Sequence, residues 1–486
     1  MRRYIAEGLY EYICEYHSVW HMPGHKRKKF SDDRSSLDMV YMDDLLDHIY
    51  TIDVTEVQGT DDLHNPTEMI KSSEEELAKV YRTFASYYLV NGSTGGIMAA
   101  VSACCKAKDK IIIADNCHKS VHNIAKLLGL EIIYIPFSDS DYLQSVSVDE
   151  VKNICARNPD AKAIVITSPT YEGIVSDIKS ISEIAKAYDM KLIADEAHGA
   201  LLPFIAEQGE HKDIIKFPQS SIYLGADIVI ESLHKTLPSM TQTAILHVQN
   251  ETMDKDIRKY LSVFMSSSPS YVMLCSMERA VAVASGWDYT TYIRELKDFR
   301  DKFKFEIKHF SLLDKDCSDK IFAYDSTRLV IRADKIEDVK ADKDENGNLT
   351  IEGSLTGAAL ESILSDRYGI VCEMSGEDYV VLISTMVDER KDLEYLYNSI
   401  KEIDENFDSI ISDRKSIMSD SACHNGEYIK TTIRILDTLE GTIAKDNIYV
   451  YPPGIYLVKK GESYTEEKLD ILRRYVRSGK QLHGEL

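Results

Sequence analysis

The amino-acid sequence predicts an α/β protein whose larger domain contains a doubly wound, mostly parallel sheet. First, short β-branched runs recur between residues 86 and 248, and several are almost wholly apolar, as in strands covered on both faces. Second, amphipathic, helix-like segments separate these runs, in the order of βαβ units. Such folds bind ligands at the carboxyl ends of their strands, so the residues that follow each run are the first candidates for function.

Seven runs predict the strands of this sheet. They are residues 86–90, 110–114, 131–136, 162–167, 191–195, 227–231 and 243–248. Between them, segments such as STGGIMAAVSACCKA and DIKSISEIAKAYDM have the spacing of helices that pack on a sheet.

The pattern changes after about residue 285. Strand-like RLVIRA, helix-like GAALESILSDRYG and strand-like YVVLIST follow, and they predict a smaller α+β domain. The acidic turn DENGN within this region has the composition of a solvated loop. We therefore divide the chain into an N-terminal arm (1–60), a major domain (61–285) and a C-terminal α+β domain (286–486).

Composition and charge exclude several classes of protein. Lys and Arg number 57 against 80 Asp and Glu, a formal net charge of −23, which would repel a phosphate backbone and argues against a nucleic-acid partner. The chain has no apolar run of about 18 residues and no signal-peptide pattern, so we expect no membrane partner. Nine scattered cysteines without Cys-x-x-Cys pairs favour free thiols in a reducing cytoplasm.

The tetrapeptide Asp195-Glu196-Ala197-His198 lies at the end of the predicted strand 191–195 and spells a signature of nucleic-acid helicases. A helicase also needs a phosphate-binding loop of the form G-x-x-x-x-G-K-[ST], and the chain has none. Asp195 therefore needs another explanation.

Two neighbouring strand ends supply it. Lys235 follows the predicted strand 227–231, and LVNGSTGG (89–96) carries another strand into a helix whose first N–H groups suit a phosphate. A lysine, an aspartate and a phosphate cup at adjacent strand ends together predict a pocket for pyridoxal 5'-phosphate.

Each residue type has a physical role in such a pocket. Lys235 would form an imine with the cofactor aldehyde, and Asp195 would keep the pyridine nitrogen protonated so that the ring accepts electrons. Ala197 is small enough to let the ring lie flat, and His198 is a candidate donor to the ring oxygen. The candidate phosphate ligands are Ser93, Thr94, Gly95, Ser232 and His234.

With these motifs the chain resembles the ornithine/lysine/arginine decarboxylase family of fold type I, aspartate aminotransferase-like, pyridoxal phosphate enzymes. The resemblance spans nearly the whole chain. Its motifs are HMPGHKR (21–27), DVTEVQGTDDLH (53–64), YYLVNGSTGGI (87–97), DNCHKSVHN (115–123), SPTYEGIVSDI (168–178), IADEAHGA (193–200), ESLHKTLPSMTQTAILH (231–247), SSSPSYVM (266–273) and YPPGI (451–455). The length is similar to that of short bacterial members without an N-terminal receiver-like domain.

The resemblance implies roles and partners. Lys235 looks like the Schiff-base lysine, Asp195 like the partner of the pyridine nitrogen and His118 like the imidazole stacked on the ring. Ser93, Thr94, Ser232 and His234 look like phosphate ligands, and Ser266 like a hydroxyl lent by a neighbouring subunit, which implies a homodimer or a larger homo-oligomer. The implied reaction is decarboxylation of arginine, lysine or ornithine to an amine and CO2. Lys235 or His234 would protonate Cα.

Several alternatives stay open at this point. Another fold type I activity, such as an aminotransferase or a lyase, uses the same cofactor pocket, and a non-catalytic relative would bind without turnover. His118 and His122, and likewise His21 and His25, have the spacing of metal pairs, but the cofactor interpretation requires no metal. Glu373 is a candidate to meet the distal cation of the substrate.

Overall fold

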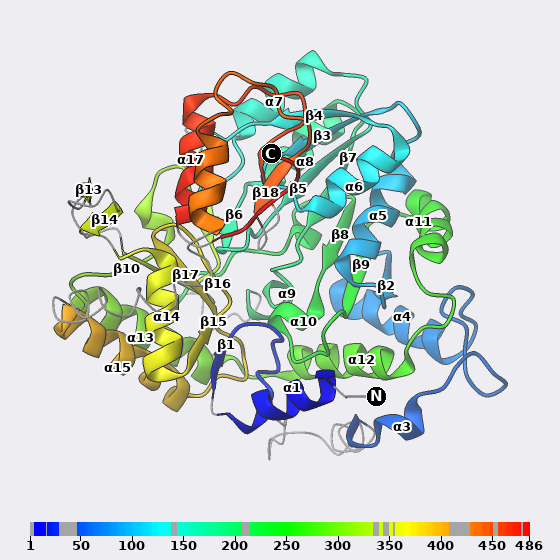
Figure 1. Ribbon diagram of the computed structural model, residues 1–486. Helices are drawn as coiled ribbons and strands as arrows, with labels where there is room; N and C mark the ends of the chain where they lie inside the picture. The colour runs from blue at the N-terminus through cyan, green and yellow to red at the C-terminus, as the bar shows by residue number, and fades with distance from the viewer. Residues whose placement is uncertain are drawn as a thin grey trace.

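The computed structural model describes residues 4–15, 17–28, 46–137, 143–206, 214–333, 340–343, 349–352, 355–407, 428–450, 455–477 and 480–486. A large α/β domain forms one side of the molecule, and the four-stranded and three-stranded sheets lie with their helices on the other (Figure 1). The predicted turn DENGN (344–348) and most of YPPGI lie outside the described residues.

The α/β domain is built on a seven-stranded sheet, as predicted. Its strands are β2 (Ala85–Leu89), β3 (Lys110–Ala114), β4 (Glu131–Ile135), β5 (Ala163–Thr167), β7 (Lys191–Asp195), β8 (Ile228–Glu231) and β9 (Ala244–Val248). They lie in the order β2-β9-β8-β7-β5-β3-β4, and β9 alone runs antiparallel to both of its neighbours. Each strand begins and ends within one residue of its predicted bounds, because burial on both faces leaves an apolar run.

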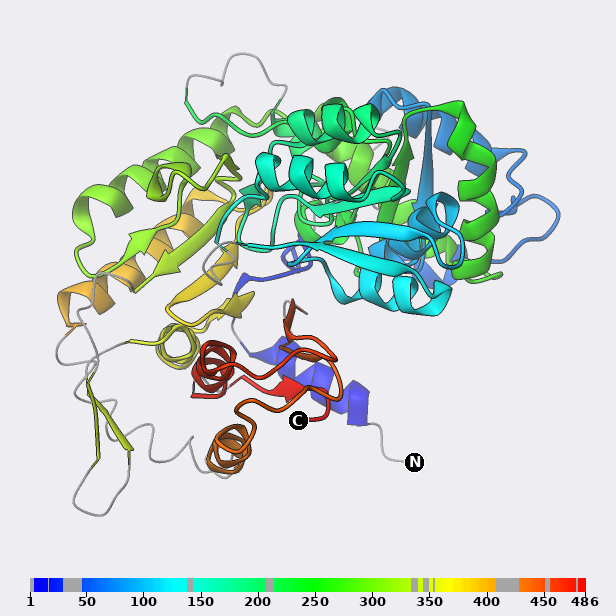
Figure 2. The ribbon, with the colours of Figure 1, turned by 90° about the horizontal axis from the view of Figure 1, so that it is seen from above.

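Helices cover both faces of this sheet. In Figure 2, α7 and α8 lie on one face and α6 lies on the other. Helix α5 packs between α6 and α11, against β8 and β9. The helices of this part are α4 (Met69–Tyr81), α5 (Gly92–Cys104), α6 (Lys119–Leu128), α7 (Val148–Arg157), α8 (Ile178–Ala187), α9 (Leu202–Ile205), α10 (Leu233–Thr236), α11 (Glu251–Phe264) and α12 (Tyr271–Gly286), with the short η3 (Ser221–Tyr223).

The next part of the chain forms an antiparallel sheet in the order β10-β12-β17-β16. Its apolar core is continuous with that of the large domain. A two-stranded pair, β6 with β11, also joins the two parts. The elements are β6 (Ile174–Val175), α13 (Thr290–Glu306), β10 (Ser311–Leu312), η4 (Lys315–Cys317), β11 (Ala323–Tyr324), β12 (Arg328–Arg332), β13 (Lys340–Lys343), β14 (Leu349–Glu352), α14 (Gly357–Tyr368), β15 (Ile370–Cys372), β16 (Met374–Ser375), β17 (Tyr379–Ile383) and α15 (Arg390–Glu405).

The N-terminal arm is tied to this second part. It contains α1 (Tyr4–Cys14), β1 (Ser18–Trp20) and α3 (Ile49–Ile52). Strand β1 pairs in parallel with β15, so that Ser18 lies opposite Ile370 and Trp20 opposite Cys372. Trp20 is 1% exposed. The arm thus anchors the HMPGHK segment that follows β1 between the two parts of the molecule.

The last residues form a C-terminal lobe, which we define as the described residues from 428 to 486. Its elements are β18 (Ile448–Val450), β19 (Ile455–Val458), α17 (Glu466–Arg477) and β20 (Leu482–His483), and its sheet has the order β19-β18-β20. The lobe has a separate apolar core that includes Leu436, Leu469 and Leu472. The predicted C-terminal domain therefore contains two packed bodies. The bounds of the three domains stay predictions.

Among the described residues, no helix combines the length and the apolar character needed to cross a membrane.

Candidate active site

A cavity of about 320 Å³ opens at the carboxyl ends of β5, β7 and β8, beside the first turn of α5. This is the edge at which a doubly wound sheet presents functional groups. The cavity brings together nine of the eleven residues that the sequence singles out: Ser93, Thr94, His118, Asp195, Ala197, His198, Ser232, His234 and Lys235.

One corner of the cavity is suited to an anion. The chain turns from β2 into α5 at Gly92, whose φ of +67° is easily reached only without a side chain. Ser93 and Thr94 follow in the first turn of the helix, where backbone N–H groups have no intrahelical acceptor and the helix dipole is positive. This corner provides N–H and hydroxyl donors at the spacing that a phosphate monoester accepts.

Asp195 and Lys235 form the opposite wall. Asp195 is the last residue of β7 and is 2% exposed, and its Oδ1 accepts from the N–H of Ala197 at 3.2 Å. Burial raises the pKa of Asp195, while the charge of Lys235 opposes that shift. Burial lowers the pKa of Lys235 to about 8, against the attraction of Asp195 and Glu373. Lys235 thus holds a far larger neutral fraction near neutral pH than an exposed lysine does, as a nucleophilic amine requires.

His198 connects this wall to the small sheet. Its Nε2 lies 2.8 Å from Nζ of Lys235, and its ring centroid lies 4.3 Å from that of Tyr171. Burial lowers the pKa of His198 well below its usual value, so the ring is neutral and Lys235 donates to Nε2. The buried Arg328 of β12 donates to the carbonyl oxygen of His198 at 2.7 Å. The C-terminal part therefore holds the backbone that carries this imidazole.

The other two histidines have defined tautomers. His118 is the N-cap of α6, where Nδ1 accepts from the N–H of Ser120, so the proton of a neutral ring lies on Nε2. In His234, Nδ1–H donates to the carbonyl oxygen of Thr243 at 2.9 Å. Burial lowers the pKa of each to about 4, and Lys235 adds to the shift in both. Both rings are neutral at physiological pH.

Two predicted residues do not line the cavity. Gly95 is buried within α5, where its N–H contacts the carbonyl oxygen of Asn91 at 3.4 Å. Ser266 is exposed, and its Oγ–H donates to the carbonyl oxygen of Ser268 at 3.2 Å. Because the expected role of Ser266 belongs to a neighbouring subunit, both assignments stay predictions.

The structure adds lining residues to which the sequence gave no role. They include Asn116, Thr167, Tyr171 and Glu172. Thr167 ends β5 directly opposite Asp195, and the other three lie in the segments that follow β3 and β5. The strand-end rule that singled out Asp195 applies equally to these positions, and it would have found them.

Glu373 lies beside the cavity, between β15 and β16. Its Oε2 accepts from the N–H of Met22 at 2.8 Å, and its Oε1 accepts from the hydroxyl of Tyr171. The carboxylate thus joins the N-terminal arm to the segment after β5. A second carboxylate, Glu172, lines the cavity itself and accepts from the hydroxyl of Tyr379 at 2.9 Å.

Unpaired buried polar atoms test whether these residues fit pyridoxal phosphate. Buried polar groups in proteins nearly always have hydrogen-bond partners. Within the described residues, however, Ser232 Oγ, His198 Nδ1 and Asn116 Oδ1 are buried without one. All three residues line the cavity. The hydroxyl of Ser232 and the imidazole N–H of His198, beside Lys235, are donors of the kind that the phosphate and the ring oxygen of this cofactor accept, so the residues present fit it.

Metal chemistry finds no comparable support in the part of the chain that the structure covers. That part contains no group of three or more His, Cys, Asp or Glu side chains arranged to hold a metal ion. The side chains of His118 and His122 make different contacts. His118 caps α6, whereas the ring of His122 packs against Tyr134 and Tyr456.

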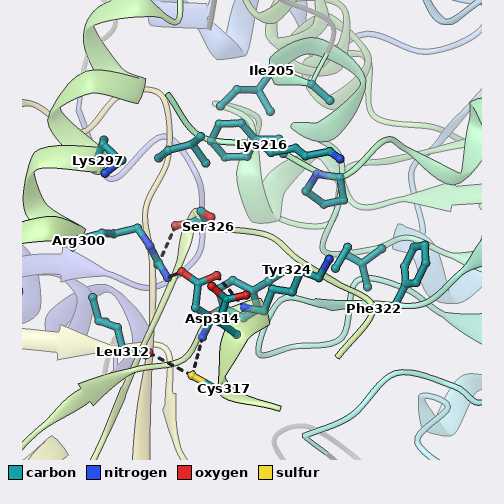
Figure 3. A pocket seen from close by; sticks show the side chains of 18 of the residues that line it. Ile205, Lys216, Lys297, Arg300, Leu312, Asp314, Cys317, Phe322, Tyr324 and Ser326 are labelled. Atoms are coloured by element: carbon teal, nitrogen blue, oxygen red, sulfur yellow. Dashed lines mark hydrogen bonds and ion pairs between the residues drawn. The ribbon is translucent and has the colours of Figure 1, made fainter. Parts of the chain in front are cut away.

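A larger cavity of about 1190 Å³ lies between the large domain and the four-stranded sheet (Figure 3). It shares no lining residue with the first cavity. Its most buried cation, Arg300, donates to the carboxylate of Asp314 at 2.7 Å and to the carbonyl oxygen of Leu313 at 2.9 Å. That guanidinium is therefore engaged in joining α13 to the turn after β10, and the smaller cavity is the candidate active site.

Comparison with solved structures agrees with this fold. The structure is similar to the Francisella novicida lysine decarboxylase LdcF, with a TM-score of 0.69 and 19% identity, over 98% of this chain and 78% of that one. It is also similar to the Sphingomonas wittichii serine palmitoyltransferase, with a TM-score of 0.55 and 12% identity, over 79% of this chain and 86% of that one. The fold is that of the fold type I pyridoxal phosphate enzymes, as predicted.

The family follows from the sequence comparison. The family model described as "Orn/Lys/Arg decarboxylase, major domain" matches residues 5–392, and this chain belongs to that family. It is 30% identical to the uncharacterized protein YaaO of Bacillus subtilis, over 96% of this chain and 93% of that protein. It is 26% identical to the arginine decarboxylase of the same species, over 98% and 94%. It is 22% identical to the inducible lysine decarboxylase of Escherichia coli, over 96% and 76%.

Proposed function

We propose that this chain is a pyridoxal phosphate-dependent decarboxylase of a basic amino acid, with arginine, lysine or ornithine as the substrate. The observation that carries the proposal is the joint placement of Lys235, Asp195 and the unpaired Ser232 hydroxyl around one cavity in a chain of this family. The relatives named as arginine and lysine decarboxylases support the reaction class and leave the choice of amino acid open.

The bound cofactor would supply an electron sink for the pair of electrons left when carbon dioxide departs. The protein groups prepare its site. Lys235 offers an amine whose pKa is lowered to about 8, and Asp195 offers a buried carboxylate for a protonated ring nitrogen. That cation would in turn favour the ionised form of Asp195, offsetting the effect of burial.

The remaining residues would orient the cofactor and exclude water from it. Ser93, Thr94, Ser232 and His234 would hold the phosphate, with Gly95 as a further backbone donor. His118 would lie against the ring, Ala197 would leave room for it, and His198 would donate to its oxygen. Lys235 or His234 would deliver the proton to Cα, since both line the cavity.

Two carboxylates are candidates for the distal cation of the substrate. Glu373 faces the region of Met22 and Tyr171, and Glu172 lines the cavity between Thr170 and Tyr379. A carboxylate that already accepts neutral donors can also accept a charged one, because each ionised carboxylate has about four lone-pair sites. We favour Glu373, because it also interacts electrostatically with Lys235 and His234.

The proposal extends to assembly and location. A homodimer would bring Ser266 of one subunit to the cavity of the other. Exposed apolar side chains on the arm, including Ile5, Leu9 and Tyr50, support an interface there. The eight cysteines within the described residues are unpaired, which supports a reducing, cytoplasmic location.

One experiment tests the proposal. Purified protein loaded with pyridoxal phosphate receives arginine, lysine and ornithine separately, and both the amine product and carbon dioxide are quantified. We expect one substrate to give equal amounts of agmatine, cadaverine or putrescine and carbon dioxide, and Lys235→Ala to give neither. Conversion of the cofactor to its amine form without release of carbon dioxide would instead support an aminotransferase. Binding without turnover of any amino acid would support a non-catalytic relative.

A further inference from the structure

Outside the cavity, the C-terminal lobe makes a charged contact with the large domain. Lys459, directly after β19, forms an ion pair with Asp115, directly after β3. The side chains are only 15% and 21% exposed, so the pair is partly shielded from water. Removing one partner of such a pair leaves the other charge desolvated and unpaired, which is costly.

Aromatic contacts surround this ion pair. Nζ of Lys459 lies 3.3 Å from the centroid of the Tyr134 ring on β4, which is a close cation–π contact. On β19, the ring centroid of Tyr456 lies 4.4 Å from that of His122 on α6. Tyr134 and His122 also stack on each other, at 5.8 Å. The lobe therefore contacts the end of β3, β4 and α6 at one place.

The turn that begins at Asp115 leads directly into the candidate active site. Asp115 is followed by Asn116, which lines the cavity, and then by His118, the N-cap of α6. The Asp115 N–H donates to the carbonyl oxygen of Ile135, so the start of this turn is fixed by backbone as well. His118 lies only three positions after Asp115, so a shift of the turn would move His118.

We propose that Lys459 is a positioning residue, which acts through Asp115 to hold the turn that presents His118 to the cofactor ring. The C-terminal lobe would thus complete the active site without contributing a residue to the cavity. This inference rests on the proposed function, because it assigns a purpose to the orientation of His118. It also gives the lobe, which has its own core, a defined task in the enzyme.

The charge matters as well as the contact. Burial raises the pKa of the Cys117 thiol, and the carboxylates of Asp195 and Asp115 add to that shift. The ammonium group of Lys459 neutralises the charge of the Asp115 carboxylate. A neutral residue at position 459 would leave the half-buried carboxylate of Asp115 without a partner. Because an unpaired, partly buried charge is costly, we expect this carboxylate to move toward water and to shift the turn.

The test uses Lys459→Met, which keeps a flexible side chain of similar length and removes the ammonium group that contacts both Asp115 and Tyr134. The matched control is Lys460→Met, the same change at the exposed neighbour. We expect Lys459→Met to lower kcat/KM about tenfold, since misplacing one catalytic group by about 1 Å can cost about a hundredfold. We also expect it to weaken the visible circular dichroism of the bound cofactor and raise its dissociation constant. Lys460→Met should match the wild type in all three.

A double-mutant cycle separates positioning from a general loss of stability. If Lys459 acts through His118, Lys459→Met in a His118→Ala background should cost nothing further, because the effects of residues that act through one network are non-additive. Fully additive losses, or unchanged kinetics and cofactor spectrum in soluble Lys459→Met, would overturn the inference. If Lys459→Met does not fold, Asp115→Asn tests the same pair with an isosteric change. An inactive wild type would refute the proposed function instead, so the two failures are distinguishable.

Discussion

Two neighbouring carboxyl groups, Asp195 and Glu196, have opposite surroundings at one strand end. Asp195 lines the cavity and faces Lys235, whose charge counteracts the effect of burial on its pKa. Glu196 points away from the cavity, and burial and the nearby Glu231 raise its pKa well above the usual value. Its Oε2 accepts from the N–H of Ser221 at 2.7 Å. One carboxyl group therefore faces a cation and open space, while the other has a raised pKa within a packed layer.

The comparison teaches that burial alone does not mark a functional acid. Asp195 is 2% exposed, Glu196 1% and Glu231 0%. Oε2 of Glu231 lies 3.5 Å from Nε2 of His247. Burial lowers the pKa of His247 to about 3, so this imidazole offers Glu231 no positive charge. The difference is in the neighbouring charges, because Asp195 lies near the cation of Lys235 whereas Glu196 lies near another carboxyl group, Glu231. We therefore expect changes on the cavity side to alter chemistry and changes on the packed side to alter stability.

The largest effect should follow from Asp195→Asn. This change keeps the shape of the side chain and removes the charge that would face a pyridinium nitrogen. We expect kcat to fall by about 10³-fold, the scale of losing one strong electrostatic contact to the developing charge. Glu196→Gln is the control, with kcat within about threefold of wild type. Equal losses in both variants, measured by carbon dioxide release, would contradict the distinction between the two sides.

A pH dependence should follow from Lys235. Its pKa is lowered to about 8, so the neutral amine needed to capture the cofactor increases as the pH rises through that value. We expect the rate at which apoenzyme regains the absorbance of bound pyridoxal phosphate to rise about 30-fold between about pH 6.5 and pH 9. A rate that continues to rise toward pH 10.5 would indicate an ordinary exposed lysine.

Ser232→Ala should have a smaller and more selective effect. The hydroxyl of Ser232 is buried without a partner in the described residues, so removing it does not break a hydrogen bond within the protein. We expect the dissociation constant of pyridoxal phosphate to rise about tenfold, the value of one hydrogen bond to a charged group. The melting temperature of the apoenzyme should stay the same or rise. A lower apoenzyme melting temperature with unchanged cofactor binding would assign Ser232 to packing alone.

Glu231→Gln should change activity least and alter the pH dependence of stability. Because burial raises the pKa of Glu231 in the folded state, its contribution to stability is full below the ordinary glutamic acid pKa and is lost as the pH rises. We expect the urea midpoint of the wild type to fall more than that of the variant between about pH 6 and about pH 8.5. Parallel midpoints across this range would show that the carboxyl pair is not protonated on folding.

The sequence predicts the central sheet and the two main catalytic candidates for physical reasons. Strands buried on both faces must be apolar, and a lysine or an aspartate directly after such strands is costly without a partner or a function. Tyr171 and Glu172 follow the end of β5, where the strand-end rule applies, but no motif at these two positions predicts a particular role. The pairing of β1 with β15 and of Lys459 with Asp115 joins residues about 350 positions apart, and no local pattern encodes those contacts.

The most direct test of the central claim is to locate the cofactor on the chain. Borohydride reduction of the loaded enzyme, followed by proteolysis and peptide mass spectrometry, should find the cofactor mass on the peptide that contains Lys235 and on no other. Loss of the visible absorbance should accompany it. Cofactor mass on a different lysine, or no cofactor mass on any peptide, would contradict the assignment of this cavity as the active site.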